Sequence, residues 1–241
     1  MVTATGEARF PVAILAGGLA TRMRPVAERI PKALFEVAGK PFIEHQLALL
    51  RREGVERVVL CVGFLGEMVE AHIGDGARFG LKVAYSFDGE RLLGTGGALR
   101  RALPMLGENF FVLYGDSYLD IAYAPVQAAY RASGLPALMT VFRNEGRWDT
   151  SNVVFDGKHV VRHDKRDRTE DMAFIDYGLG VVNSDIIRAW KDEAFDLSDL
   201  YGSLAREGRL AGFEATTRFY EIGTPSGLAE ADAHLSGRTK P

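Results

Sequence analysis

The chain has 241 residues, of which 47% are hydrophobic, and a formal net charge of −3. This length and composition fit one large α/β domain with a substantial core. The charge balance gives no general positive surface for nucleic acid or an anionic membrane, so any cationic site must be local. Because no apolar run approaches 18 residues and the first ten residues lack a signal-peptide core, we expect a cytoplasmic protein without a membrane partner.

The first half of the chain alternates between strand-like and helix-like segments. Strands are expected at 12–15, 57–62, 82–85 and 110–114, and helices at 41–53, 67–72 and 97–103. Gly54 follows the first of these helices, at a position where glycine commonly ends a helix. Such alternation predicts parallel strands joined by crossover helices, and therefore a Rossmann-like three-layer α/β/α sandwich.

Beyond about residue 135 the pattern contains more strands and fewer helices. Strands are expected at 137–142, 152–155, 159–163, 179–182, 210–213 and 218–222, and helices at 199–207 and 226–235. Asp156-Gly157 is typical of a hairpin turn between two of these strands. We therefore expect a mixed but mostly parallel sheet in a single domain over residues 1–241, with two halves at about 10–135 and 136–241.

Three kinds of chemistry find no support in the sequence. Cys61 lies within an apolar strand-like run, so it is expected in the core, and a single cysteine cannot form an intramolecular disulfide. The five histidines lack the spacing of zinc ligands. No G-x-S-x-G motif occurs, so covalent hydrolase chemistry is not expected.

A loop rich in glycine and cations follows the first predicted strand. Gly17 and Gly18 allow the backbone to approach a bulky group, and Arg22, Arg24 and Lys32 come later in the same loop. Backbone N–H groups and fixed cations at the end of a strand suit the phosphates of a nucleoside triphosphate. The Walker and dinucleotide-binding glycine patterns are both absent. An ordinary strand-to-helix turn with surface arginines is the alternative.

A second glycine cluster, at 94–97, follows a predicted strand and opens a predicted helix. Its amides are expected to face the same cleft as Gly17 and Gly18. The alternative is structural: Thr95 would cap the helix, and Gly96 and Gly97 would allow close packing.

Two carboxylates and one lysine complete the candidate site. Asp116 and Glu221 each follow a predicted strand, where a carboxylate can hold Mg²⁺ together with phosphate oxygens. Asp116 could instead cap a helix. Lys165 follows the strand expected at 159–163 and offers a cation in the second half, although it also lies in a charged run at 162–168 that is typical of a solvated surface.

Taken in order, these residues resemble the sugar-1-phosphate nucleotidylyltransferases. That family's opening motif, Gly-Gly-x-Gly-Thr-Arg-Leu-Arg-Pro, is followed by Pro-Lys-Pro-Leu and Gly-Lys-Pro, and residues 17–25, 31–34 and 39–41 match these motifs at the expected spacing. Five motifs between residues 15 and 225 carry the resemblance. It implies the three-layer fold of the nucleotide-diphospho-sugar transferases.

Within this family, residues 86–90 and 93–98 most resemble the D-glycero-D-manno-heptose 1-phosphate guanylyltransferase branch. Transfer of uridylyl or thymidylyl groups to other sugar 1-phosphates, such as N-acetylmuramate 1-phosphate, stays open. A catalytically weak relative that binds sugar nucleotides as a regulator is a further alternative. It is disfavoured because the chain retains the full set of charged residues, which binding alone does not require.

The resemblance also implies the reaction and the residue roles. A sugar 1-phosphate and a nucleoside triphosphate would be the substrates and Mg²⁺ the cofactor; oligomeric state is left open. The implied catalytic residues are Arg22 on the β- and γ-phosphates, Lys32 on the α-phosphate, and Asp116. The implied binding residues are Leu15, Ala16, Gly17, Gly18, Arg22 and Gly94 for the nucleotide, Lys165, Asn152 and Asp176 for the sugar phosphate, and Asp116 with Glu221 for the metal.

The chain also departs from the family pattern. Ala20 replaces the third glycine of the opening motif, and Ala33 replaces the proline that follows the lysine. Glu221 stands where many relatives carry Asp, Asp164-Lys165 replaces Glu-Lys, and Asp176 replaces an Asn.

Overall fold

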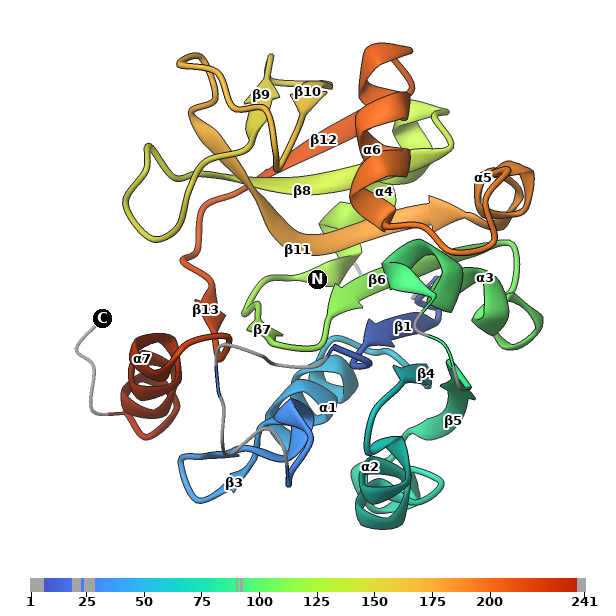
Figure 1. Ribbon diagram of the computed structural model, residues 1–241, viewed down its shortest axis with the longest axis vertical. Coiled ribbons are helices and arrows are strands. Elements are labelled where there is room, and N and C mark those ends of the chain that lie inside the picture. The colour runs from blue at the N-terminus through green and yellow to red at the C-terminus, as the bar shows by residue number, and fades with distance from the viewer. Residues whose placement is uncertain (1–6, 19–22, 24–28, 90, 92, 238–241) are drawn as a thin grey trace, which may run out of the picture.

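The computed structural model describes residues 7–18, 23, 29–89, 91 and 93–237. Within these residues the central sheet has nine strands, in the order β10-β9-β11-β6-β1-β4-β5, with β8 paired to β11 and β12 paired to β8 (Figure 1). The strands are β1 (Val12–Leu15), β4 (Arg57–Val62), β5 (Lys82–Phe87), β6 (Asn109–Tyr114), β8 (Ala137–Arg143), β9 (Val153–Phe155), β10 (Val160–His163), β11 (Phe174–Asn183) and β12 (Leu210–Ala215).

The sheet is parallel in the first half of the chain and mixed in the second. Strands β5, β4, β1 and β6 run parallel to their neighbours. Strand β11 then pairs antiparallel with β6 and with β8, whereas β12 is parallel to β8. Because β1, β4, β5 and β6 share one direction, their carboxyl ends lie at one edge of the sheet.

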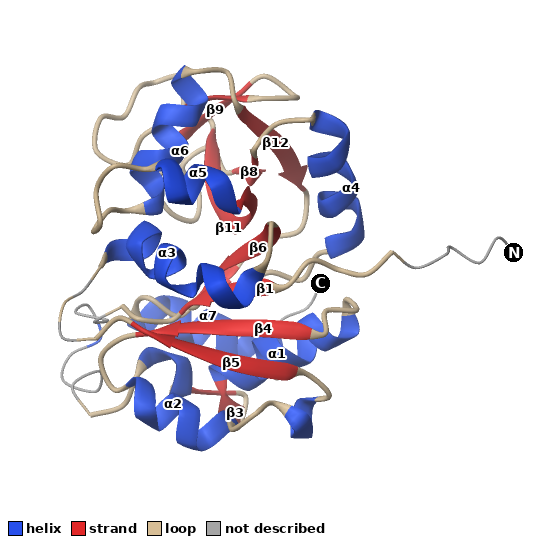
Figure 2. Cartoon of the chain, turned by 90° about the vertical axis from the view of Figure 1, so that its right-hand side faces the viewer, coloured by secondary structure: helices blue, strands red, loops and turns tan. Residues whose placement is uncertain are grey.

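Helices cover both faces of the sheet, and each face has its own apolar core. Side chains of α1 (Phe42–Arg52), α2 (Gly66–Ile73) and α4 (Tyr123–Ser133) share one core with Val12 and Ile14. Those of α3 (Gly94–Leu106), α5 (Ser184–Ala189) and α6 (Leu197–Arg206) share the other with Ala13. Figure 2 shows α5 and α6 on one side of the sheet and α4 on the other. This alternation of side chains confirms the predicted three-layer sandwich.

The C-terminal helix α7 (Pro225–Leu235) packs on a third, smaller apolar cluster that includes Phe42 and Ile222. It follows β13 (Tyr220–Glu221), which pairs antiparallel with β7 (Ser117–Tyr118), directly after the end of β6 (Figure 1). A second short pair joins β2 (Glu36–Val37) to β3 (Lys40–Pro41), and 3-10 helices span Lys32–Leu34 and Ala77–Phe79. None of the helices described combines the length and the apolar surface that crossing a bilayer requires.

Most expected elements are present, and the local chemistry of their ends is as predicted. Gly54 has φ +81° and its N–H donates to the Arg51 carbonyl, so it ends α1. In the turn at Asp156-Gly157, Asp156 Oδ1 accepts from the N–H groups of Lys158 and His159, and the flanking strands β9 and β10 pair antiparallel. Cys61 is buried, and burial raises its pKa to about 12, as a core thiol requires.

Three expected elements have clearly different bounds in the structure, and two helices were not expected. The strand expected at 179–182 is longer and begins at Phe174. Its first part was not predicted, because Gly178 at φ +98° and a register shift between Asp176 and Gly180 interrupt the apolar alternation. The strand expected at 218–222 is only Tyr220–Glu221, and the helix expected at 97–103 runs over Gly94–Leu106. Helices α4 and α5 were not expected, since α4 has a proline in its first turn and α5 has only six residues.

Candidate functional site

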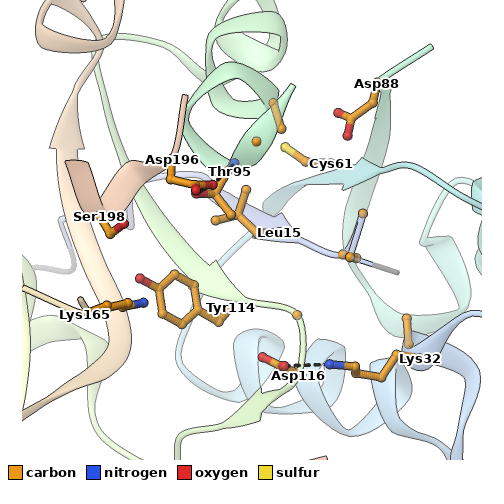
Figure 3. Close-up of a pocket in the computed structure, with 17 residues that line it drawn as sticks. Leu15, Lys32, Cys61, Asp88, Thr95, Tyr114, Asp116, Lys165, Asp196 and Ser198 are labelled. Atoms are coloured by element: carbon orange, nitrogen blue, oxygen red, sulfur yellow. Dashed lines mark hydrogen bonds and ion pairs between the residues drawn. The ribbon is translucent and has the colours of Figure 1, made fainter. Parts of the chain in front are cut away.

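A cavity lies at the sheet edge where the parallel strands end (Figure 3). It has a volume of about 450 Å³. Its wall is formed by the end of β4, by the residues that end or follow β1, β5 and β6, and by the start of α3 and the residues before and within α6. Its lining residues are Leu15, Ala16, Gly17, Gly18, Lys32, Ala33, Cys61, Asp88, Gly94, Thr95, Ala98, Tyr114, Gly115, Asp116, Lys165, Asp196 and Ser198.

The first glycine loop enters this cavity as predicted. A Cβ at Gly17 would lie 3.1 Å from Gly63 N and 3.3 Å from Asp88 Oδ2, so the backbones after β1 and β4 are in close contact there. A Cβ at Gly18 would meet nothing within 4 Å, so this residue borders open space. Arg22, and with it Ala20 and Arg24, lies outside the described residues, so its role stays a prediction.

The second glycine cluster only partly faces the cavity. Gly94 and Thr95 line it, but the N–H groups of Gly96 and Gly97 donate to the Phe195 carbonyl. The expectation that all these amides face the cleft is therefore wrong. Of the structural alternative, the capping part is wrong, since Thr95 Oγ1 does not cap α3 and instead accepts from Leu197 N at 2.8 Å, at the start of α6. The close packing at Gly96 and Gly97 is confirmed, because an added Cβ would lie 2.1 Å and 2.7 Å from Phe195 and Glu193.

Lys32 and Asp116 meet at the mouth of the cavity. Lys32 Nζ lies 2.9 Å from Asp116 Oδ2, and Figure 3 shows the two side chains pointing toward each other. Asp116 precedes strand β7, so it is not the cap of a helix. Gln46, buried on α1, holds this loop by donating to the carbonyls of Tyr114 and Ser117, on either side of Asp116.

Glu221 is brought next to Asp116 by the pairing of β13 with β7. Glu221 stands opposite Ser117, whose hydroxyl donates to Glu221 Oε1 at 3.4 Å, and Ile222 N donates to the Asp116 carbonyl. Burial and the neighbouring Asp116 charge raise the pKa of Glu221 to about 7. Two adjacent carboxylates fit a divalent cation, and two protein carboxylates suffice for Mg²⁺ when phosphate and water complete its shell.

Lys165 is a partly exposed lysine that lies beside the buried carboxylate of Asp176. Its Nζ lies 3.8 Å from Asp176 Oδ2 and 5.1 Å from the centre of the Tyr114 ring. Tyr114 donates its hydroxyl to Asp176 Oδ2 at 2.6 Å, and Asn152 Oδ1 accepts from Asp176 N at 2.9 Å. The irregularity in β11 after Asp176 lets this strand present the carboxylate to the site, as bulges beside functional sites commonly do. The structure thus joins Lys165, Asp176 and Asn152.

A second cavity, of about 790 Å³, adjoins the first. Four residues border both cavities: Lys32, Tyr114, Asp116 and Lys165. The second is also bordered by aromatic and charged side chains that the sequence alone did not single out, among them Trp148, Arg218 and Tyr220. Arg218 stacks its guanidinium on the Trp148 and Tyr220 rings, at 3.5 Å and 4.7 Å.

Asp88, Tyr114 and Gln46 are further residues at the site to which the sequence assigned no role, although Asp88 lies in the motif at 86–90 and Tyr114 ends the strand expected at 110–114. Asp88 and Tyr114 end or follow parallel strands, and this position alone could have marked them. Nothing in the sequence marks Gln46, since it lies on a helix that packs against the sheet.

The fold and the site define an α/β protein with two adjoining cavities and with lysines and a carboxylate at their junction. Comparison with known proteins gives the family. Residues 12–159 match the family model described as nucleotidyl transferase. The chain belongs to this family, as its motifs indicated.

The relatives it resembles act on different sugars. The chain is 33% identical to the N-acetylmuramate alpha-1-phosphate uridylyltransferase of Caulobacter vibrioides, over 92% of this chain and 96% of that one. It is 26% identical to the D-glycero-alpha-D-manno-heptose 1-phosphate guanylyltransferase of Campylobacter jejuni, over 88% and 94%. HddC from Yersinia pseudotuberculosis, solved complexed with GMP-PN, has the same fold, with a TM-score of 0.79 at 24% identity over 94% and 99%. The protein is therefore an enzyme, a sugar-1-phosphate nucleotidyltransferase.

Proposed function

We propose that this protein transfers a guanylyl group from GTP to D-glycero-D-manno-heptose 1-phosphate, forming the GDP-sugar and pyrophosphate. The observation that carries the transfer is the junction of the two cavities. Lys32, Asp116 and Lys165 border both, so a triphosphate in one cavity and a sugar phosphate in the other would meet among these charges. The choice of substrates rests on the resemblance of residues 86–98 to the heptose branch.

The reaction needs positioning and charge, and no covalent enzyme intermediate. A phosphate oxygen of the sugar phosphate attacks the α-phosphorus in line, the α–β phosphoanhydride bond breaks, and pyrophosphate leaves with that bond's electrons. Lys32 lies where it can offset the charge of the α-phosphate, and Lys165 where it can hold the sugar phosphate. Arg22, on the resemblance, would hold the departing phosphates.

Mg²⁺ fits the pair formed by Asp116 and Glu221. Bound there, it would supply positive charge to the phosphate oxygens and help orient them. Lys32 would also position Asp116. Its ammonium group pairs with Asp116 at 2.9 Å and so holds that carboxylate in place at the end of β6.

A second candidate is uridylyl transfer to N-acetylmuramate 1-phosphate. The observation that favours it is the higher identity of the chain to such an enzyme, 33% against 26% for the heptose enzyme. The two candidates share the reaction and the roles of Lys32, Asp116 and Lys165. They differ in the base and in the sugar.

Pyrophosphate release from a matrix of substrates tests the proposal. The purified protein would be mixed with Mg²⁺, each of the four common NTPs and dTTP, and a set of sugar 1-phosphates that includes both candidates. Release with GTP and heptose phosphate alone supports the proposal, and release with UTP and N-acetylmuramate 1-phosphate establishes the second candidate. If no pair reacts while a nucleotide or sugar nucleotide still raises the melting temperature, a regulatory homologue is the better description.

A further inference from the structure

His163 is a buried histidine to which the proposed reaction gives no role. Its side chain has no exposed surface, and it lies at the end of β10, two residues before Lys165. Neither ring nitrogen makes a hydrogen bond of normal geometry within the described part of the chain, although the Ser198 backbone lies close enough to favour the charged ring. A buried polar group without a partner is costly, so this ring needs a physical explanation.

The ring faces a buried carboxylate that it shares with two other side chains. Asp176 Oδ2 lies 4.0 Å from His163 Nε2 and 3.8 Å from Lys165 Nζ, and the Tyr114 hydroxyl donates to the same oxygen at 2.6 Å. The Asp176 side chain is 4% exposed, so these neighbours, rather than water, offset its charge. The titratable groups that face the ring come from three segments: Asp176 on β11, Asp164 and Lys165 after β10, and Tyr201 on α6.

Lys165 can leave this carboxylate when a phosphate arrives. Its side chain is 44% exposed and borders both cavities, and Figure 3 shows its ammonium group beside the Tyr114 ring. The phosphate of a sugar 1-phosphate carries about two negative charges and three acceptor oxygens, so it attracts the ammonium group more strongly than one carboxylate does. Once Lys165 turns to the phosphate, the buried Asp176 carboxylate keeps the uncharged Tyr114 hydroxyl and the uncharged His163 ring beside it.

The surroundings of His163 favour a proton as soon as Lys165 turns away. In the free protein burial chiefly, and the Lys165 charge in addition, hold the pKa of His163 below its usual value, whereas the Asp176 carboxylate acts to raise it. Loss of the Lys165 charge removes an effect that opposes protonation and leaves the carboxylate that favours it. Asp176 borders the second cavity, so a proton from the solvent can reach Nε2 of the ring by way of this carboxylate.

We propose that binding of the sugar phosphate draws Lys165 away from Asp176, and that His163 takes up a proton from the solvent to replace the lost charge. His163 is thus a positioning residue, because the charged ring keeps Asp176 ionised and in place while Lys165 holds the phosphate. The inference rests on the role of Lys165 in the proposed function, but it requires only the phosphate and holds for any sugar 1-phosphate. Since the proton is bound in the complex, this group strengthens binding of the sugar phosphate as the pH falls.

NMR titration of the histidine Cε1 protons between pH 5 and 8 tests this inference. A saturating sugar 1-phosphate should raise the titration midpoint of His163 by about 1 pH unit, the usual effect of one nearby charge. Lys165→Ala should raise the midpoint by a similar amount in the free protein. Lys158→Ala is the matched control and should leave it unchanged, because Lys158 is an exposed lysine in the turn before β10. His163→Phe identifies the signal.

The pH dependence of KM for the sugar phosphate gives a readout that a purely structural role of His163 would not move. The ratio of this KM in His163→Phe to that in the unchanged protein should grow by up to about 10-fold as the pH falls from 8 to 5.5, the counterpart of a 1-unit rise in the midpoint. Titration of the phosphate itself affects both proteins alike and cancels in the ratio. A constant ratio overturns the inference.

Two results overturn the inference even if His163→Phe does not fold. One is a bound sugar phosphate that leaves the midpoints of all five histidines unchanged. The other is a midpoint that rises with the ligand but not in Lys165→Ala, because Lys165 would then not be the charge that is replaced.

Titration with both heptose phosphate and N-acetylmuramate 1-phosphate separates this inference from the proposed function. A rise with N-acetylmuramate 1-phosphate, without binding of heptose phosphate, supports the inference and contradicts the proposed sugar. Binding of heptose phosphate without any rise does the reverse. Amide signals that respond to neither ligand contradict both.

Discussion

Lys165 shows how a residue in a charged surface run becomes part of a site. Its side chain is 44% exposed, yet its ammonium group lies over the Tyr114 ring and 3.8 Å from the buried Asp176 carboxylate. The Tyr114 hydroxyl occupies the same carboxylate oxygen, Oδ2. Asp176 therefore orients Lys165 toward the junction of the two cavities. The Tyr114 hydroxyl uses part of the hydrogen-bonding capacity of the Asp176 carboxylate.

We expect Lys165→Ala to raise KM for the sugar phosphate about 10-fold or more, the usual worth of a hydrogen bond to a charged group, while KM for the nucleotide changes little. Steady-state kinetics with each substrate varied in turn would measure this. Lys158→Ala is the control, since Lys158 is an exposed lysine in the turn between β9 and β10. An equal rise in KM for both substrates would show that Lys165 does not serve the sugar phosphate in particular.

At the scale of elements, the start of α3 is held against the segment before α6 by close backbone contact. A Cβ at Gly96 would lie 2.1 Å from the Phe195 ring, and a Cβ at Gly97 would lie 2.7 Å from the Glu193 carbonyl. Phe195 has little freedom to move, because Trp190 stacks on it at 5.4 Å and the Arg100 guanidinium lies 5.0 Å from its ring centre. Part of the glycine motif thus serves packing between the two halves of the chain.

Gly96→Ala should lower the free energy of unfolding by about 1–3 kcal/mol through overpacking, as followed by urea denaturation. Combining it with Phe195→Ala removes the side chain with which the new methyl group collides. The double variant should therefore lose less stability than the sum of the two single losses, by about 0.5 kcal/mol or more. Simple additivity would show that the methyl group is accommodated elsewhere.

The burial of His163, at the end of β10, leads us to expect that the free energy of unfolding depends on pH. Its side chain is fully buried, faces Asp176, Lys165 and Tyr201, and has a pKa below the usual 6.5, chiefly because burial disfavours the charged ring. Above pH 6.5 the ring is neutral in both the folded and the unfolded chain. Below pH 6.5 the His163 ring of the unfolded chain binds a proton, whereas the ring of the folded chain binds one only at lower pH. His163 therefore makes the free energy of unfolding fall as the pH falls.

Replacing this residue by His163→Phe keeps a ring against Tyr201 and removes the proton. We expect the free energy of unfolding of the unchanged protein to fall more steeply than that of the variant below pH 6.5, by at most about 1.4 kcal/mol per pH unit, the value for one proton. Urea unfolding between pH 5 and 8 would measure both slopes. Parallel curves would mean that His163 is protonated equally in the two states.

At the scale of the whole molecule, the sequence predicted the features that arise from local periodicity. The parallel strands and the layers were predictable because apolar runs and helix ends are local signals, and the family motifs marked Lys32, Asp116, Lys165 and Glu221. Asp88 and Gln46 were given no role because their places at the cavity and against the loop after β6 arise only when the strands and α1 are packed together. For the glycines at 96 and 97 the sequence left both a cleft-facing and a packing role open, because it does not show that Phe195 occupies the space beside them.

The pairing of β7 with β13 brings residues 116 and 221, from the first and second halves of the chain, into one acidic pair. No group of three or more acidic, histidine or cysteine side chains suited to a metal occurs among the described residues, so Asp116 and Glu221 offer Mg²⁺ an incomplete shell. Phosphate oxygens of a bound nucleotide can complete it. Mg²⁺ and nucleotide should therefore bind cooperatively, each tightening the other to the same extent.

Melting temperatures measure this coupling without any turnover. GTP and Mg²⁺ together should stabilise the protein by more than the sum of their separate effects, and a nucleotide at 100 times its Kd contributes about 2.7 kcal/mol. Asp116→Asn should remove the excess while leaving the effect of metal-free GTP. Glu221→Gln should do the same, because either loss leaves a single carboxylate and ends the repulsion that a cation would relieve. If chelating Mg²⁺ leaves the stabilisation by GTP unchanged, the acidic pair does not hold the metal, and its role is to pair with Lys32 and Ser117 alone.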